Sequence, residues 1–441
     1  MDQRKGELQQ LVEDLLREAK RLGATAAEAA VSSNAGLSLT VRLGETETIE
    51  HTRDNGLGVT VYFDHRKGSA STSDLSPHAI KETVEAACNF ARYTSEDACS
   101  GLADAELMAS DNPDLDLYHP WQQSVEEAIE QAIRCEDAAR DFDPRIVNSE
   151  GASLNSHNGL HVYGNTHGFM GGYPSSRHSL SCAVVGKQNE SMQRDYWYTL
   201  SRQSSRLDSP EEVGRVAAQR TLARLNARQL PTQQAPVLFQ ADVAVGLLRS
   251  FIGAIRGSAL YRKASFLLDH LGKPVFPDFV TIHEEPRLPM GLASAAYDNE
   301  GVTTHNRVFV DQGVLESYVL DSYAARKLGM QTTGNAGGVR NLRINSGELD
   351  WEGLLRTMNR GLVVTELMGQ GVNMVTGDYS RGAAGFWVEG GEIQYPVEEI
   401  TIAGNMRDML MGLQQVGTDV ETRSSVQTGS WLIERMMIAG E

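Results

Sequence analysis

The sequence is poor in cysteine and contains no long hydrophobic run. Its four cysteines, spread over 441 residues, form no Cys-x-x-Cys pair, which argues against a disulfide framework and against a structural zinc site. No stretch approaches the roughly 18 consecutive apolar residues of a membrane span, and the charged N-terminus has no apolar signal-peptide core. We therefore expect a cytoplasmic protein without a membrane-embedded segment.

The chain also lacks any run of lysine and arginine. Its formal net charge is −18, from 40 basic and 58 acidic residues, and such a charge repels a polyanion at long range. Direct binding of nucleic acid is therefore not expected. At 441 residues the chain exceeds one ordinary hydrophobic core, so its length predicts two or three domains.

The sequence does contain a clear succession of helical and extended patterns. Apolar residues at helical spacing over 8–22 predict an amphipathic N-terminal helix. Residues 27–72 are typical of several short strands, because β-forming residues are interrupted by turn signals at 34–36 and 54–56 and by a hairpin signal at 65–68. The later part of the N-terminal half predicts helices at 77–93, 124–140 and 210–230 and a β-rich region at 147–198.

Two segments without periodicity divide the chain. Residues 94–120 are rich in Ser, Asp, Gly and Pro, and a polar linker flanked by prolines lies at 225–235. They predict domains at 1–110, 111–230 and 231–441. Because helices and strands are partly segregated, we expect an α+β, multidomain fold: an N-terminal α/β domain followed by a β-rich C-terminal domain.

The residues alone reveal no self-evident active site. His283 heads the only His-Glu pair, but a proline follows and no second histidine comes one turn later, so a helical zinc motif is missing. His157 and His161 are four apart, yet Asn158-Gly159 between them predicts a turn. The glycine-rich segment 334–338 lacks the lysine of a phosphate-binding loop and predicts a tight loop with positive φ.

Asp378, Ser380 and Arg381 form a short polar cluster near the C-terminus. Their segment is not the Gly-x-Ser-x-Gly elbow of serine hydrolases, and no base is fixed to it in the sequence. We take these three residues as substrate-binding candidates and as the place where an unrecognised hydrolytic site would lie.

Three long segments resemble the TldD/PmbA family of peptidase-related proteins. They are GLGVTVYFDHRKGSASTSDLS at 56–76, YDNEGVTTHNRVFVDQGVLESYVLDSYAARKLGMQTTGNAGG at 297–338 and TGDYSRGAAGFWVEGGEIQYPVEEITIAGN at 376–405. The resemblance covers nearly the whole chain and implies a partnership of two homologous subunits. The TldD type holds zinc with a His-Glu-x-x-x-His helix and a late cysteine, whereas the PmbA (TldE) type lacks these ligands.

This chain resembles the PmbA (TldE) type. In the register of the Arg-Lys and Gly-Thr pairs shared with TldD-type chains, all four zinc-site positions are changed: the histidines to Arg249 and Ala254, the general-base glutamate to Ser250 and the cysteine to Asp419. A permanent cation, a methyl group and a hydroxyl cannot replace imidazoles and a carboxylate base, and one carboxylate is not a catalytic zinc site. The resemblance thus implies no metal and no catalytic residue here, with zinc in a TldD-type partner.

The resemblance also implies a substrate. Family members act on unfolded peptides held in a cavity between subunits, extended as an added strand, in leader removal from microcin-type peptides and in antitoxin degradation, and a genetic link ties them to DNA gyrase. We expect residues 377–387 to line this cavity, the competing structural interpretation being a tight turn with a core Trp387. Homodimerisation without the partner stays open.

Two other functions stay open at this stage. One is a stand-alone hydrolase that uses the cluster around Asp378, Ser380 and Arg381. The other is a gyrase-modulating or peptide-binding protein that works without proteolysis. Zinc content and co-purifying partners distinguish these from the subunit of a heteromeric peptidase.

Overall fold

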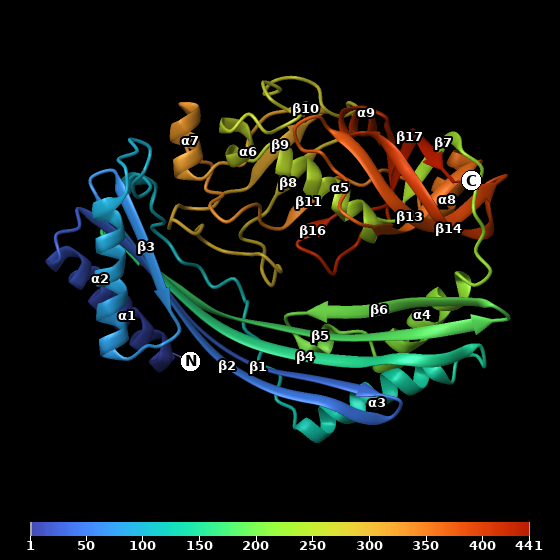
Figure 1. Cartoon of the computed structure of the whole chain (residues 1–441), viewed down its shortest axis with the longest axis horizontal. Helices are drawn as coiled ribbons and strands as arrows, with labels where there is room; N and C mark the ends of the chain where they lie inside the picture. Colours follow the sequence, from blue (N-terminus) through green and yellow to red (C-terminus); the bar gives the residue numbers. More distant parts are fainter. Residues whose placement is uncertain (1, 441) are drawn as a thin grey trace.

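A strongly curved antiparallel sheet spans the N-terminal half of the computed structural model, which describes residues 2–440 (Figure 1). Its strand order is β3-β2-β1-β4-β5-β6, and every neighbouring pair is antiparallel. The strands are β1 (Ala26–Arg42), β2 (Glu45–Phe63), β3 (Arg66–Thr72), β4 (Ile146–Asn165), β5 (Met170–Gln188) and β6 (Ser191–Ser201).

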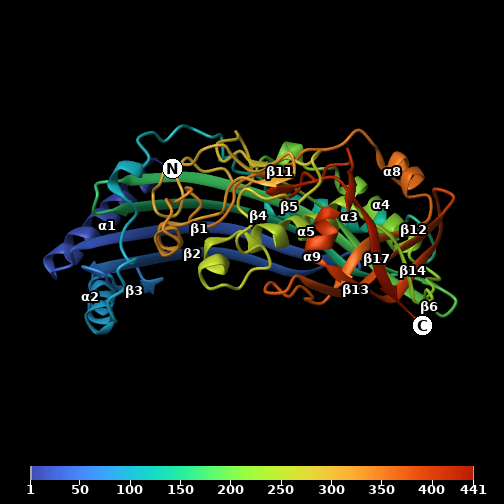
Figure 2. The same ribbon diagram turned by 90° about the horizontal axis from the view of Figure 1, so that it is seen from above.

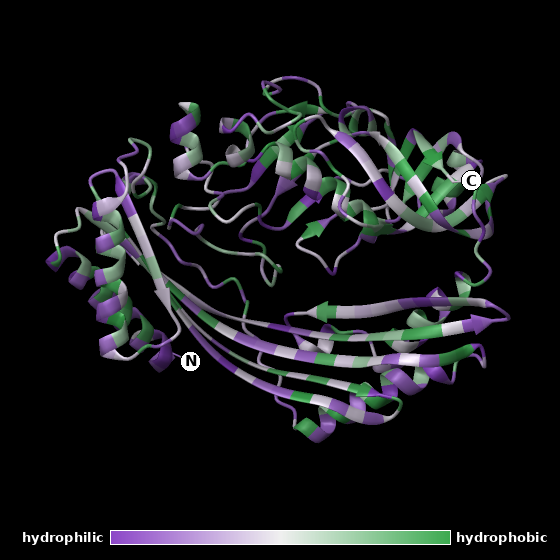
Figure 3. Cartoon of the chain, in the orientation of Figure 1, coloured by the Kyte–Doolittle hydropathy of each residue, from purple (hydrophilic) through white to green (hydrophobic). Residues whose placement is uncertain are grey.

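Helices cover only the convex face of this sheet. On β1 the residues Ala29, Val31 and Leu39 are buried and share one face, because side chains alternate along a strand. Ala29 and Val31 belong to one apolar cluster and Leu39 to another, so two helix pairs pack side by side on the same face (Figure 3). The pairs are α1 (Asp2–Arg21) with α2 (Pro77–Tyr93), and α3 (Val125–Arg140) with α4 (Pro210–Ala223).

The helix starts follow the capping signals of the sequence. Ser124 accepts a hydrogen bond from the backbone of Glu127, and the Glu127 side chain accepts one from the Ser124 backbone, which completes a capping box. Ser76 and Ser209 each cap their helix by accepting one backbone hydrogen bond, in α2 and α4 respectively, and each stands just before a proline in the first turn. The predicted helices at 77–93 and 124–140 are therefore confirmed.

The turn signals at 34–36, 54–56 and 158–159 were wrong as turns. All three lie within unbroken strands and face each other across the sheet, with Asn34 opposite both Asp54 and Gly159. The glycine at position 36 instead lets a side chain of the neighbouring strand approach the backbone closely, because a Cβ on Gly36 would lie 2.3 Å from Nδ1 of His157. The hairpin at 65–68 is confirmed, since Phe63 of β2 pairs with Arg66 of β3.

The C-terminal half is built on two further sheets. In the larger one, pairing of β14 with β17 joins otherwise separate strands and closes the sheet on itself. Its order is β14-β13-β12-β7-β17-β15, with β7 (Gln233–Phe239), β12 (Gly361–Met368), β13 (Asp378–Glu389), β14 (Glu392–Asn405), β15 (Leu413–Val416) and β17 (Trp431–Ala439). The smaller sheet has the order β10-β9-β8-β11-β16, with β8 (Ile282–Glu284), β9 (Arg307–Asp311), β10 (Val314–Leu315), β11 (Leu342–Ile344) and β16 (Val426–Gln427).

One large apolar core holds these sheets together around the helix α5 (Ala241–Ala254). Phe251 of α5 contacts Phe276 edge to face, and Phe276 contacts Trp431 of β17 in the same manner. The mixed α+β, multidomain class with a β-rich C-terminal part is therefore confirmed. The shorter helices are α6 (Gly257–Tyr261), α7 (Ser322–Leu328), α8 (Trp351–Met358) and α9 (Met406–Met411), with 3₁₀ turns at Ala105–Leu107 and Ser204–Arg206.

The expected domain limits stay predictions. Strands from both sides of position 110 pair within one sheet, since β1 lies between β2 and β4. Strand pairing changes from the curved sheet to the closed sheet between β6 and β7, with residues 225–235 in that interval. We refer below to the N-terminal unit (residues 2–225) and the C-terminal unit (residues 233–440).

The C-terminal unit lies over the concave face of the curved sheet (Figures 1 and 2). Arginine side chains make many of the contacts between the units. Arg326 donates to the carbonyls of Cys99, Gly101 and Leu102, and Arg287 forms an ion pair with Asp111, at 2.7 Å. The bonds from Arg326 satisfy backbone carbonyls of the segment between α2 and α3, which forms no strand within the described residues.

We predict opposite effects for two glycine-to-alanine changes in helices. Gly214→Ala should destabilise the protein by roughly 1–3 kcal/mol, since its Cβ would lie 2.1 Å from the carbonyl oxygen of Cys135 in α3. Gly246→Ala, with no neighbour within 4 Å, should stabilise it by roughly 0.5–1 kcal/mol through helix propensity. Urea unfolding measures both, and a stabilised Gly214→Ala variant would contradict the close packing of α3 against α4.

We also predict a pH-dependent contribution from Glu300, which lies where the C-terminal unit meets the curved sheet. Burial raises the pKa of Glu300 to about 7 from 4.5, and its Oε2 accepts a hydrogen bond from the Ser322 backbone. Between these values the folded chain keeps a proton that the unfolded chain has released. The contribution of Glu300 to the free energy of unfolding therefore falls as pH rises from 4.5 to 7, by about 3 kcal/mol in total.

Glu300→Gln keeps the hydrogen-bond acceptor and removes the titration. The free energy of unfolding of this variant, relative to the unaltered chain, should be higher at pH 8 than at pH 5. Glu13→Gln, which removes an exposed carboxylate from α1, controls for the loss of one charge. If the free energies of unfolding of Glu300→Gln and the unaltered chain differ by the same amount at both pH values, the prediction is contradicted.

Candidate functional site

The edge strand β6, the helix α5 and the segment 419–425 enclose two adjacent cavities of about 400 and 320 Å³. The two cavities share Leu200, Asp242, Glu421 and Arg423. They therefore form one continuous depression between the N-terminal and C-terminal units, which we call the β6–α5 cleft. A cleft between two units is a common place for a binding site.

Arg423 bridges the β6–α5 cleft. Its Nη1 donates to the carbonyl of Tyr198, at 3.0 Å, and its guanidinium lies 3.7 Å from the ring centre of Trp197 and 4.5 Å from that of Tyr198. Glu421 accepts from Nε and Nη2 of Arg423, so the cation is paired as well as stacked. This clamp fixes segment 419–425 to the edge of the curved sheet.

Asp242 lies in the first turn of α5 and faces the same cleft. Burial raises the pKa of the Asp242 carboxyl, and Arg220, whose Nη2 is 3.8 Å from an Asp242 oxygen, opposes this effect. The Arg220 guanidinium also lies over the ring of Trp197, at 5.2 Å from its centre. The indole thus lies between two arginines, and both cations have a carboxylate nearby.

Of the four positions that the resemblance assigns to a zinc site, only Arg249 and Asp419 line the β6–α5 cleft. Arg249 is exposed and donates from Nη2 to Ser424 Oγ, at 3.2 Å, while the hydroxyl of Ser250 donates to the Gly246 carbonyl, at 2.9 Å. Ala254 is fully buried in the core. Both oxygens of Asp419 accept from Ser430, at 2.9 Å from N and 2.6 Å from Oγ.

These residues do not fit a catalytic zinc ion. Arg249 has no lone pair to donate, Ala254 has no donor atom, and the Asp419 carboxylate is already engaged. Residues 2–440 contain no group of three or more His, Cys, Asp or Glu arranged to hold a metal ion.

Asp378, Ser380 and Arg381 do not converge on one site. They follow one another on β13, so Asp378 and Ser380 point to one side of the strand and Arg381 to the other. Asp378 accepts from the Thr376 hydroxyl, at 2.6 Å, and Arg381 donates to the Leu367 carbonyl. None of the three lines the β6–α5 cleft.

The surrounding segment 377–387 combines a turn with a core tryptophan. Gly377 has φ 83°, a conformation that favours glycine. Trp387 is 2% exposed, donates from Nε1 to Glu389 and belongs to the apolar core. The structural interpretation of this segment accounts for its glycine and its tryptophan, and its expected place in a peptide cavity stays a prediction.

The other sequence candidates are structural. The positive φ predicted for segment 334–338 is confirmed at Gly334, Gly337 and Gly338. His157 and His161 lie within β4, where the predicted turn is absent, and burial lowers the pKa of His161. Neither of these segments supplies a catalytic group.

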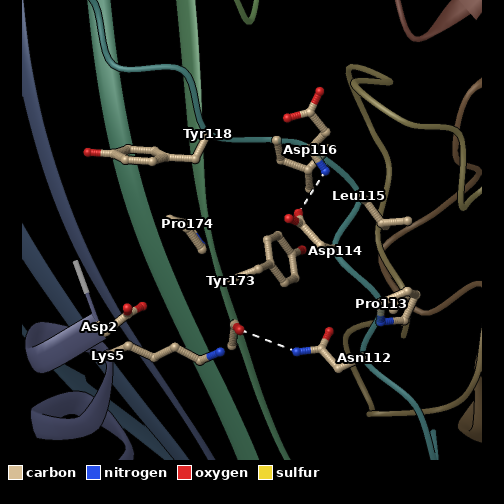
Figure 4. Close-up of a pocket in the computed structure, with 13 residues that line it drawn as sticks. Asp2, Lys5, Asn112, Pro113, Asp114, Leu115, Asp116, Tyr118, Tyr173 and Pro174 are labelled. Carbon is tan, nitrogen blue, oxygen red and sulfur yellow. Dashed lines mark hydrogen bonds between the residues drawn. The ribbon is translucent and has the colours of Figure 1, made fainter.

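A separate polar cavity of about 430 Å³ lies between the start of α1, segment 112–118 and β5 (Figure 4). Asn112 donates to the Gly172 carbonyl, which ties this segment to β5. Asp114 and Asp116 lie close together there, and Asp114 accepts from the Asp116 backbone. The Asn112 bond thus holds part of the segment between α2 and α3 against the sheet.

Sequence reasoning missed the residues that build the β6–α5 cleft. Trp197, Tyr198, Asp242 and Arg423 carry no local motif, and they meet only through tertiary structure: Tyr198 and Arg423 are 225 positions apart. The signal that was available was the adjacent Trp197-Tyr198 pair at the end of the predicted β-rich region 147–198.

The sequence of this chain matches the models of one known protein family. Three family models, described as domain 1, the central domain and the C-terminal domain of PmbA/TldA metallopeptidases, match residues 27–91, 118–225 and 232–440. The chain is 56% identical over 415 residues to Metalloprotease PmbA of Escherichia coli O157:H7, covering 94% of this chain and 92% of that protein. It is 52% identical over 437 residues to a PmbA homologue of Haemophilus influenzae, covering 98% and 96%.

Solved structures of related proteins have the same fold as this chain. A Bacteroides thetaiotaomicron protein, named as a candidate modulator of DNA gyrase, superposes with a TM-score of 0.93 at 28% identity and 99% coverage of both chains. TldE of Thermococcus kodakarensis has the same fold, with a TM-score of 0.84 at 21% identity over 98% of this chain and 100% of that one. All three domain models match, and two relatives share more than half of their aligned residues with it, so the chain belongs to the PmbA/TldD family of metallopeptidases.

Proposed function

We propose that this chain is the PmbA (TldE)-type subunit of a heteromeric zinc peptidase and carries no zinc of its own. The observation that supports this most is the donor set on α5 and segment 419–425. Arg249 stands where the resemblance to TldD-type chains places a zinc histidine, and a permanent cation there repels Zn²⁺. A TldD-type homologue with an intact His-Glu-x-x-x-His helix supplies the metal and the general base.

The role proposed for this subunit is to hold the peptide. β6 is the last strand of the curved sheet, and the carbonyl of Tyr198 faces the β6–α5 cleft, where Arg423 donates to it. An extended, unfolded peptide can add to such an edge through main-chain hydrogen bonds, which tolerate many sequences. This mode suits a processing enzyme whose substrates share little sequence.

We propose unfolded peptides as the substrates, in leader removal from microcin-type peptides and in antitoxin turnover, in the cytoplasm. None of the described helices is long and apolar enough to cross a membrane. The net charge of −18 disfavours contact with DNA, so the link of this family to gyrase is proposed to run through a peptide substrate. Homodimers are proposed only when the partner is absent.

A stand-alone hydrolase is less well supported. Asp378 and Arg381 point to opposite sides of β13, so they cannot act together on one substrate bond. A peptide-binding protein without proteolytic function keeps the support of the β6–α5 cleft. Cleavage by a mixture of the two subunits decides between that protein and the proposed subunit.

We predict that the purified chain cleaves no unfolded peptide alone and supports cleavage when mixed with a TldD-type partner. A fluorescent unfolded peptide is incubated with each subunit and with their mixture, with and without a chelator. Cleavage only in the mixture, lost with the chelator, is expected because the metal and the base come from the partner. Chelator-sensitive cleavage by this chain alone would overturn the assignment.

We further predict that Arg249→His does not create a zinc site. On the regular helix α5, residues five apart are separated by about 140°, so position 254 lies on another face. Ala254 is moreover buried in the core. Metal analysis after dialysis should therefore find no stoichiometric zinc in the variant, as in the unaltered chain. One zinc per variant chain would show that a metal-binding geometry persists in the β6–α5 cleft.

A further inference from the structure

Two arginines without a carboxylate partner line the smaller, 320 Å³ cavity of the β6–α5 cleft. They are Arg177 of β5 and Arg249 of α5, and within residues 2–440 neither forms an ion pair. The two carboxylates in the same cavity are engaged elsewhere: Glu421 by Arg423, and Asp242 by Arg220. The cavity therefore carries an excess of positive charge in a chain whose net charge is −18.

The hydroxyl of Ser424 is a third free donor in this cavity. Ser424 Oγ accepts from Arg249 Nη2, at 3.2 Å, and from the Val426 backbone, at 3.1 Å. A hydroxyl has two acceptor lone pairs and one proton, so both lone pairs are used. In the part of the chain that the structure describes, the Ser424 proton has no acceptor, and an incoming anion can supply one.

A buried cation behind the cavity adds to the positive potential. Arg202 is 8% exposed and bonds only to carbonyl oxygens, those of Ser176, Gly291 and Leu292. Leu292 itself lines the cavity. Burial lowers the pKa of Arg202, and Arg177 acts in the same direction. No carboxylate among residues 2–440 forms an ion pair with Arg202, so a negative ligand nearby is favoured.

We propose that this cavity binds a carboxylate of the peptide substrate, held by Arg177, Arg249 and Ser424. This inference rests on the proposed function and names the substrate group that the subunit recognises. Guanidinium groups bind carboxylates through two parallel hydrogen bonds, and Arg177 offers all its donors. The cavity adjoins Tyr198 of β6, so a peptide added to this edge brings its carboxylate within reach.

The chemistry favours a peptide carboxylate over a polyanion. The cavity is small, and the acidic surface of the chain repels nucleic acid at long range. The carboxylate can come from the C-terminus of the peptide or from an Asp or Glu side chain. Arg249, at the place of a zinc ligand in the TldD type, then binds substrate instead of metal.

The test is equilibrium binding of fluorescent peptides to the purified chain, measured by fluorescence polarisation. Three unfolded peptides of one neutral sequence are compared: one with a free C-terminal carboxylate, one with a C-terminal amide, and one amidated with an internal glutamate. Binding of at least one carboxylate-bearing peptide should be about tenfold or more tighter than binding of the amide, since a charge-assisted pair is gained. The preferred peptide identifies the source of the carboxylate.

Matched variants show which side chains produce the preference for carboxylate-bearing peptides. Arg249→Ala and Arg177→Ala should each reduce the preference to about twofold or less, and Arg249→Lys should keep part of it because the charge remains. Arg17→Ala, which removes an exposed cation from α1, should leave the preference unchanged. The three side chains altered in these variants are all exposed, so circular dichroism is expected to show unaltered folding.

The outcomes separate this inference from the proposed function. Equal binding of all three peptides, or no binding of any, would overturn the carboxylate site, and stimulation of partner-dependent cleavage would still support the subunit role. A carboxylate preference that survives both Arg177→Ala and Arg249→Ala would also overturn it. A preference lost in these variants, without any stimulation of cleavage, would support the site and contradict the subunit role.

Discussion

The β6–α5 cleft depends on the contact that Arg423 makes between the two units. A guanidinium placed against the faces of Trp197 and Tyr198, and paired with Glu421, fixes segment 419–425 to the edge of the curved sheet. Removing one partner of a buried pair typically costs about 3–5 kcal/mol, because the other charge is left buried. The shape of the β6–α5 cleft, and hence any ligand it takes, follows from this contact.

The helix α5 presents one face to the apolar core and another to the β6–α5 cleft. Its buried face, with Leu248 and Phe251, packs in the large core and fixes the helix in place. Its other face reaches the cleft, where Arg249 is free to differ in chemistry without loss of packing. A change of side chain at position 249 therefore alters the chemistry of the cleft and leaves the packing of α5 unchanged.

Local signals in the sequence predicted the helices well, because caps and prolines act within one turn. Ser124 with Glu127 and Ser76 with Pro77 are such signals. The strands were harder, since Asn34 and Gly159 have turn propensity yet pair within long strands, where tertiary contacts override it. The cleft could not be predicted: Tyr198, Asp242 and Arg423 are brought together only by the packing of one unit on the other.

The central claim is that this chain shapes the site and its partner holds the metal. Native mass spectrometry of the mixed subunits measures this most directly, by weighing the intact complex and then each subunit released from it in the gas phase. The account predicts zinc in the complex and in the released TldD-type subunit, with this chain at its metal-free mass. Zinc retained by this chain after release would contradict the account.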